Sequence, residues 1–166
     1  MTTDDPHPDL RTAELRVTDL RTTARLTAEG WTMYDITKAL RSGVLVRVKR
    51  GVYAPGGAMS VREAHVRLVR AVAEQSANSV ISHVSAAVLH GLPVRNAALN
   101  RVHVTRPDTG HGKTSAHQQL HLRPLDDGEV VVRDGVRVTS LVRTIVAFAR
   151  DVNAVAARRL VGKAQV

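Results

Sequence analysis

Apolar residues recur at helical spacing in three segments near the start of the chain. In residues 10–20 they stand three or four positions apart, which predicts a first helix. A second, shorter helix is expected in the run TARLTAEG, because Thr22 or Thr23 can cap its start and Gly30 can end it. The apolar positions of the first helix are Leu10, Ala13, Val17 and Leu20.

The third segment, WTMYDITKALRSG, carries the most complete set of helix signals. Thr32 is a good N-cap, and Asp35 follows three residues later, as in a variant of the capping box. Trp31 and Ile36 are spaced for a hydrophobic staple, and Gly43 suits the position just after the helix end. The stripe expected to be buried is Met33, Ile36 and Leu40.

The next segment changes from helical spacing to alternation. Valines alternate with Leu45 and Arg47, Lys49-Arg50-Gly51 has the residues of a turn, and the chain then returns through Val52-Tyr53-Ala54. This pattern predicts a β-hairpin. Pro55-Gly56-Gly57 then breaks the chain and marks a domain boundary. Two helices, a glycine turn, a capped helix and a basic hairpin are the layout of a winged helix-turn-helix.

Helices and short strands are both expected in the rest of the chain. Residues 60–76 form an amphipathic helical pattern, and the short strand SVI precedes the helix HVSAAVLHG, which Ser82 can cap and Gly91 can end. Residues 101–105 alternate as a strand, and residues 106–116 read as a loop. Further strand-like pieces are residues 117–123, 129–134 and 136–140. The last two helices are expected from about Leu141 to Arg150 and from Asn153 onward. The face of the helix over 60–76 expected to be buried is Val61, Ala64, Leu68, Ala71 and Val72.

These elements predict an α+β protein, in which an N-terminal winged helix-turn-helix precedes a second domain with a short mixed sheet flanked by helices. Residues 1–9 are polar and contain two prolines, so we expect a disordered tail. Residues 10–57 are expected to form the winged domain, and residues 58–166 the second domain. Because the sequence ends within a helical pattern, we expect either a natural short form or a chain truncated at its C-terminus.

Charge and composition then narrow the choice of partner. The chain has 24 Lys and Arg, most of them Arg, against 15 Asp and Glu, which gives a net charge of +9. A small basic protein favours a polyanion, most often nucleic acid. Aromatic residues make up 2% of the chain, too few for the stacking platforms that bind single strands, so double-stranded DNA fits better.

Several classes of protein are excluded or disfavoured. The chain has no cysteine, which excludes a disulfide framework and a cysteine-based zinc site. No apolar run approaches the ~18 residues that a membrane-spanning helix needs. The N-terminus carries acids rather than the basic start of a secretory signal, so a cytoplasmic location without membrane contact is expected.

The positive charge is concentrated in the third helix and the hairpin. Residues 36–61 contain five basic residues and no acid, whereas residues 1–35 contain four Arg and seven acids. A helix fits the major groove, and a basic hairpin beside it can contact phosphates or the minor groove. Base contacts are expected from Thr37, Lys38 and Arg41, and phosphate contacts at the helix start from Thr32 and Tyr34. Hairpin contacts are expected from Arg47, Lys49 and Arg50, whereas Tyr53 is expected to pack on the helices.

Two stretches resemble a known family. The run TAEGWTMYDITKALRSGVLVRVKRGVYAPGG is similar to the N-terminal winged-helix domain of AbiEi-family antitoxins of type IV toxin–antitoxin systems, with the segment from Leu45 to Ala54 as its most specific piece. SVISHVSAAVLHGLPV, VHVTRP and GVRVTSLVRTIVAFAR resemble the second domain of that family. The resemblance covers most of residues 20–150.

The resemblance implies a transcriptional repressor that binds inverted repeats upstream of its own operon, as a monomer or homodimer on DNA. It also implies a nucleotidyltransferase-like toxin, which the antitoxin opposes without forming a stable complex. Many relatives are longer at the C-terminus. A stand-alone phage or prophage repressor that uses the same DNA-binding head is therefore the alternative.

Enzyme activity is not expected. Gly112-Lys113-Thr114 follows a predicted strand, as in a nucleotide-binding loop, but Pro107 occupies the place of the first glycine of that motif and has no N–H to offer a phosphate. Nucleotide binding is therefore only a remote alternative. Ser82, His83 and Ser85 lack the glycine elbow of a nucleophilic serine.

Eight histidines raise the question of a metal site. His117 and His121 can share a face, with His103 and His111 nearby in the sequence, but the neighbouring acids lack a recognisable ligand spacing. His83 and His90 are expected to serve packing or capping. We therefore expect no metal and no cofactor.

Overall fold

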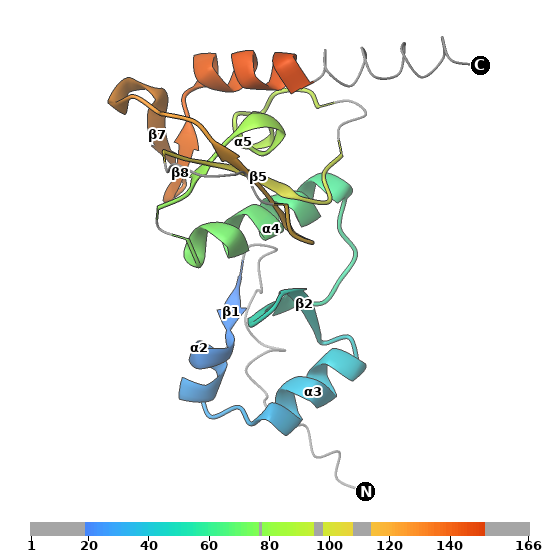
Figure 1. Cartoon of the computed structure of the whole chain (residues 1–166). Helices are drawn as coiled ribbons and strands as arrows, with labels where there is room; N and C mark the ends of the chain where they lie inside the picture. The colour runs from blue at the N-terminus through green and yellow to red at the C-terminus, as the bar shows by residue number, and fades with distance from the viewer. Residues whose placement is uncertain (1–18, 77, 95–97, 108–113, 152–166) are drawn as a thin grey trace, which may run out of the picture. The chain divides into compact units, whose positions relative to one another are not determined.

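The computed structural model describes residues 19–76, 78–94, 98–107 and 114–151 of an α+β chain (Figure 1). The chain forms two compact units, Met1–Ala71 and Val72–Val166. The expected tail and the helix expected from Asn153 lie outside the described residues, as does most of the helix expected over 10–20, whose last two positions are not helical. None of the helices in the described part of the chain combines the length and apolar character needed to cross a bilayer.

The first unit contains two short helices with well-formed ends. Helix α2 (Thr23–Ala28) starts at Thr22, whose hydroxyl accepts a hydrogen bond from the backbone N of Arg25. Gly30 then turns the chain at φ +90°, a left-handed conformation that residues with a Cβ rarely adopt. Helix α3 (Met33–Arg41) follows.

The capping box predicted for α3 is confirmed. The backbone N of Thr32 donates to Oδ2 of Asp35 over 2.9 Å, and the backbone N of Asp35 donates to Oγ1 of Thr32 over 3.2 Å. The helix ends at Ser42, and Gly43 follows with φ +75°, as expected for the glycine after a helix. The local sequence therefore fixes both ends of α3.

A three-stranded antiparallel sheet completes the first unit, in the order β1-β3-β2. Its strands are β1 (Arg21–Thr22), β2 (Leu45–Lys49) and β3 (Val52–Pro55). The predicted hairpin is confirmed, with Lys49 paired to Val52 rather than in the turn, and with a bulge at Val48. Strand β1 is not predicted from the sequence, because two residues are too few to show an alternation of apolar and polar positions.

One buried cluster connects α2, α3 and the hairpin. It consists of Leu26, Trp31, Ile36, Ala39, Leu45 and Tyr53, with half-buried Leu40 packed against it. The prediction that Tyr53 packs in the core is confirmed. The prediction that Met33 is buried is wrong, because 62% of its surface is exposed. Trp31, which precedes the helix, belongs to the cluster beside Ile36, so the buried stripe is completed from outside α3.

Helix α4 (Val61–Glu74) begins with a second capping box, in which the backbone N of Ser60 donates to Glu63 over 2.7 Å and the backbone N of Glu63 donates to Ser60 Oγ. Leu68, Ala71 and Val72 are buried as expected. The prediction is wrong for Val61 and Ala64, which are exposed. They lie in the first turn, before the helix reaches the core, and the buried positions nearest to them are His65 and Arg67.

The second unit is built on a five-stranded mixed sheet, in the order β6-β5-β4-β8-β7. Strand β4 runs parallel to β8, and β5 runs parallel to β6, whereas the β4–β5 and β7–β8 pairs are antiparallel. The strands are β4 (Val80–Ile81), β5 (Val102–Arg106), β6 (Gln118–Leu122), β7 (Val130–Arg133) and β8 (Val136–Thr139). A 3₁₀ turn, η1 (Asp127–Glu129), precedes β7, and a helix over residues 141–151 follows β8. The predicted short mixed sheet is confirmed.

Helix α5 (His83–Leu89) packs closely on β5 and β8 (Figure 1). Ser85, Ala86 and Ala87 are fully buried, and their small side chains allow this close contact. Gly91 ends the helix region at φ +79°. Ser82 stands at the N-cap position, but its side chain makes no capping bond, so that prediction is wrong. Its hydroxyl instead accepts a hydrogen bond from Thr105 Oγ1 over 2.8 Å.

The segment read as a domain break contains a close backbone contact. The backbone N of Gly56 donates to the carbonyl of Val44 over 2.9 Å, and a Cβ on Gly56 would overlap the carbonyl oxygen of Gly43. Because the clash is with backbone, it cannot be relieved by rotating a side chain. Gly56 therefore lets β3 leave the hairpin directly beside the end of α3.

We predict that Gly56→Ala destabilises the protein by about 1–3 kcal/mol, the usual cost of overpacking. Gly128→Ala is the matched control, because an added Cβ there meets no atom within 4 Å. Thermal unfolding followed by circular dichroism measures both. Equal melting temperatures for the two variants would show that the backbone contact at Gly56 is not tight.

Candidate functional site

The solvent-facing side of α3 carries the residues that the sequence singles out. Thr32, Tyr34, Thr37, Lys38 and Arg41 are all exposed, with 74% of the Tyr34 surface accessible. Burial of Ile36 and Ala39 on one side places Lys38 and Arg41 on the other, because helix positions advance by about 100° per residue. A shallow depression on this side is lined by Met33, Tyr34, Thr37, Lys38, Arg41 and Ser42.

Two of the predicted contact residues already use their hydroxyl protons within the helix. Oγ1 of Thr37 donates to the carbonyl of Met33 over 2.8 Å, and Oγ1 of Thr32 donates to Oδ2 of Asp35 over 2.6 Å. The geometry therefore assigns Thr32 to capping, and it leaves the Thr37 methyl group and oxygen for an external contact. Tyr34, Lys38 and Arg41 are the long polar side chains of this surface.

The hairpin adds three cations that differ in their surroundings. Arg47 and Arg50 are exposed, whereas Lys49 is half-buried, and this burial lowers its pKa. The guanidinium carbon of Arg47 lies 5.9 Å from the centroid of the Tyr53 ring, within the range of a cation–π contact. Tyr53 thus packs in the core and also supports a cation on the hairpin surface.

Acidic residues near this surface are engaged in local contacts. Asp35 is held in the capping box of α3. Glu29 accepts from Arg25 over 3.0 Å and from Arg21 over 3.4 Å. Together with the absence of acids from residues 36–61, these pairs leave α3 and the hairpin with a positive character.

Of Gly112-Lys113-Thr114, the structure describes only Thr114. Gly112 and Lys113 lie outside the described residues, and Thr114 bridges to Gln119 beside β6. The Thr114 hydroxyl donates to Oε1 of Gln119 over 2.6 Å. The remote alternative therefore remains a sequence-based hypothesis.

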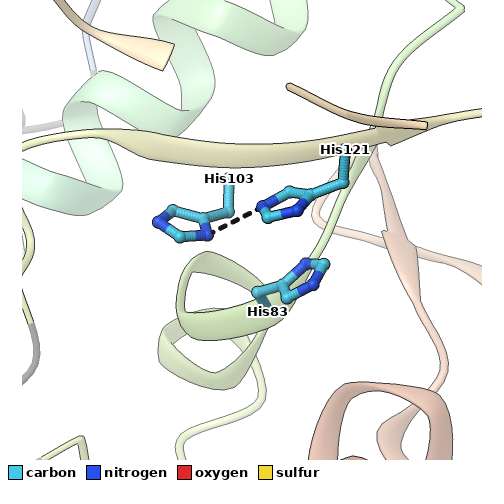
Figure 2. Close-up of side chains that lie close together, drawn as sticks. All are labelled: His83, His103 and His121. Atoms are coloured by element: carbon cyan, nitrogen blue, oxygen red, sulfur yellow. Dashed lines mark hydrogen bonds between the residues drawn. The ribbon is translucent and has the colours of Figure 1, made fainter. Parts of the chain in front are cut away.

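The second unit brings three histidines together, one each from α5, β5 and β6 (Figure 2). Nε2 of His121 lies 3.1 Å from Nδ1 of His103, and the rings of His83 and His121 stack with their centroids 3.7 Å apart. Of the four histidines that the sequence places near one another, His103 and His121 belong to the group, whereas exposed His117 does not and His111 lies outside the described residues.

The place of His83 in this group is not predicted from the sequence, where packing or capping is the expected role of His83. No local sequence pattern indicates this group, because His83 meets the other two histidines only through the order of the strands, with β4 beside β5 and β5 beside β6. His90 does have a structural contact, since its Nε2 lies 2.8 Å from the carbonyl oxygen of Thr139.

The local environment keeps two of these histidines uncharged. Burial, with smaller contributions from neighbouring His121 and His103, lowers the pKa of His83 to about 3. Burial and the charge of Arg123 lower the pKa of His121. Asp151 lies nearby, with Oδ2 4.0 Å from Nδ1 of His103, and burial raises the pKa of this carboxyl group. At neutral pH the His83 and His121 rings therefore offer lone pairs rather than charge.

A cavity of ≈ 200 Å³ lies beside the histidines. His83 and His121 line it, and so does Asp151. The other polar residues of its wall are Arg123, Arg143, Arg150, Ser82, Thr105 and Thr139. The wall thus combines imidazoles, guanidinium groups and hydroxyls within the second unit.

The sequence matches no protein-family model and no curated protein.

We predict that a substitution on the buried side of α3 lowers the stability of the protein, whereas substitutions on its exposed side change the stability little. Ile36→Ala should lower the free energy of unfolding by about 2–5 kcal/mol, because Ile36 is 1% exposed. Lys38→Ala and Arg41→Ala should each change it by no more than about 0.5 kcal/mol, as is usual for surface positions. Urea unfolding followed by Trp31 fluorescence measures all three. A large loss of stability in Arg41→Ala would mean that this residue holds the fold.

Proposed function

We propose that this protein is a sequence-specific double-stranded DNA-binding repressor whose DNA-binding head is a winged helix-turn-helix. The observation that carries the proposal is the exposed basic side of α3 together with the basic hairpin that contacts it. The succession of α2, the Gly30 turn, α3 and the β2–β3 hairpin supports this kind of head. In this proposal α3 is the recognition helix and the hairpin is the wing.

The dimensions and chemistry of α3 suit the major groove. Its nine residues extend about 14 Å, and a groove about 12 Å wide accepts one helix. Arg41 is the side chain best suited to read a base, because a guanidinium can donate two hydrogen bonds to O6 and N7 of guanine. Lys38 and Tyr34 contact phosphates, as do the backbone N–H groups in the first turn of the helix.

The wing is proposed to hold the DNA backbone. Arg47 rests over the Tyr53 ring, so its guanidinium is positioned before binding and loses less freedom on contact with a phosphate. Arg50 lies at the tip of the hairpin, where it can reach a phosphate or the adjacent minor groove. Lys49 adds charge from a half-buried position.

The placement of aromatic residues favours a duplex over a single strand. The chain has four aromatic side chains, of which Trp31 and Tyr53 are buried and Phe148 is half-buried. Only Tyr34 offers an exposed ring, whereas single-strand binding requires several rings on which successive bases stack.

The biological setting is proposed from the resemblance to AbiEi-family antitoxins. In that setting the protein represses its own operon from inverted repeats, in the cytoplasm, and opposes a nucleotidyltransferase-like toxin without a stable complex. A stand-alone phage or prophage repressor with the same head is the second candidate. Neither role includes catalysis by this chain.

We predict that the purified protein binds duplex DNA from the region upstream of its own gene more tightly than scrambled DNA of equal length. Phosphate contacts release counterions, so the affinity should fall steeply as salt rises. Fluorescence anisotropy titrations at several salt concentrations measure both effects. Equal affinity for the two duplexes at moderate salt would rule out a specific repressor.

For the recognition helix, Arg41→Ala should weaken operator binding by about 1–3 kcal/mol and relax the preference at one base pair. Titrations against single-base variants of the operator locate that position. Lys38→Ala is the comparison within the helix, since loss of a phosphate contact weakens all duplexes alike. If Arg41→Ala discriminates among the variants as the parent protein does, α3 is not the element that reads the sequence.

For the wing, the double variant Lys49→Ala, Arg50→Ala should weaken binding to every duplex and reduce the salt slope by about 1–2. Arg101→Ala with Arg137→Ala removes the same charge from exposed positions of the second unit and serves as the matched control. If both double variants lower the salt slope equally, net charge rather than the wing explains the binding.

A further inference from the structure

Three histidines from three separate elements converge at the start of α5 (Figure 2). Each offers one ring nitrogen, and these three atoms lie within 4.8 Å of one another. His83 is the first residue of α5, His103 lies on β5 and His121 lies on β6. The sheet and the helix thus hold the three rings around one point, although 18 residues separate His103 from His121.

We propose that His83, His103 and His121 bind one divalent transition-metal ion of the zinc class, with the fourth coordination position open to the adjacent cavity. Imidazole nitrogens are good ligands for zinc, and three histidines with an open position form a known type of zinc centre. This site lies in the second unit, whereas the residues of the proposed DNA-binding surface belong to the first.

The spacing of His103 and His121 fits this ion. In tetrahedral coordination with metal–nitrogen bonds of about 2.0–2.1 Å, two ligand nitrogens stand about 3.3–3.4 Å apart. Nε2 of His121 and Nδ1 of His103 are 3.1 Å apart. Without a metal, one of these two nitrogens must carry a proton for the other to accept. A bound ion takes the place of that proton.

The His83 ring must turn out of its stacked position to complete the site. Its ring is stacked on that of His121, with 17° between the planes, whereas an ion coordinated by both must lie close to both ring planes. Nδ1 of His83 lies 2.9 Å from Oγ of Ser82. When Nδ1–H donates to this hydroxyl, Nε2 presents its lone pair as a ligand. A partner on the second nitrogen is what orients most histidine ligands.

The backbone at His83 is a second, independent observation. Its φ is +51°, a left-handed conformation that is strained for a residue with a Cβ. Such strain persists where the surrounding structure requires a side chain in a particular direction, and it is concentrated at functional sites. Here the strained residue is the one that carries its ring from the start of α5 toward β5 and β6 (Figure 2).

The cavity indicates what occupies the fourth position. Asp151, with Oδ2 4.0 Å from Nδ1 of His103, brings an acidic group close to the ion. Arg123 and Arg143 line the cavity and favour an anion or a polarised water there. The site therefore suits a metal ion that presents its open position to a small anionic ligand.

The test uses the full chain after removal of metal with a chelator. Zinc titrated against a competing chromophoric chelator should bind at one ion per chain, and cobalt should give the intense visible absorption of tetrahedral coordination. His103→Gln and His121→Asn should each reduce zinc affinity by on the order of a hundredfold, since even the partners that orient a ligand contribute about 10–100-fold. His117→Gln, an exposed histidine outside the group, is the matched control and should leave the affinity unchanged.

A measurement on the parent protein tests the metal site even if a variant does not fold. X-ray absorption of the zinc-loaded parent should show three imidazole ligands. Absence of stoichiometric binding, or equal affinity in His121→Asn and His117→Gln, would overturn the proposal. Inorganic phosphate that binds the metal-free protein and is lost in Arg123→Ala, with no zinc binding, would instead identify an anion site. None of these measurements uses DNA or a residue of α3 or the hairpin, so the two proposals fail separately.

Discussion

The two-sided character of α3 is the constraint on which the first unit depends. Ile36 and Ala39 enter a cluster to which α2 contributes Leu26 and the hairpin contributes Leu45 and Tyr53. This arrangement buries those residues and keeps Lys38 and Arg41 exposed to water. The packing that stabilises the unit thereby also determines which side chains of α3 face outward, and the proposed function uses that outward side.

Features encoded by neighbouring residues could be predicted from the sequence. Thr32 and Asp35 form the expected capping box, and Gly30 and Gly43 adopt the left-handed conformations that their positions indicated. The hairpin was recognisable from its alternation. These signals act over a few residues, so a single sequence contains all the information that they require.

Features that depend on the tertiary structure could not be predicted in the same way. Met33 has the right spacing for burial, but Trp31 from outside the helix belongs to the buried cluster instead. The group of His83, His103 and His121 depends on parallel pairing of β5 with β6 and on the position of α5 beside β5. The spacing of these histidines in the sequence indicates neither the strand pairing nor the position of α5. The group is brought together by the order of the strands and not by a local periodicity.

The bulge at Val48 divides the β2–β3 hairpin into a base and a tip, and the core constrains these two parts differently. Before it, Leu45, Val46 and Arg47 are paired with β3 in a register that the core residues Leu45 and Tyr53 require. After the bulge, the extra residue shifts the pairing register. Side chains at the tip therefore need not follow the same alternation between the two faces as those of the base. Mutations can therefore accumulate at the tip while the base stays constant. In evolutionary terms, the hairpin can acquire a new contact surface without a new fold.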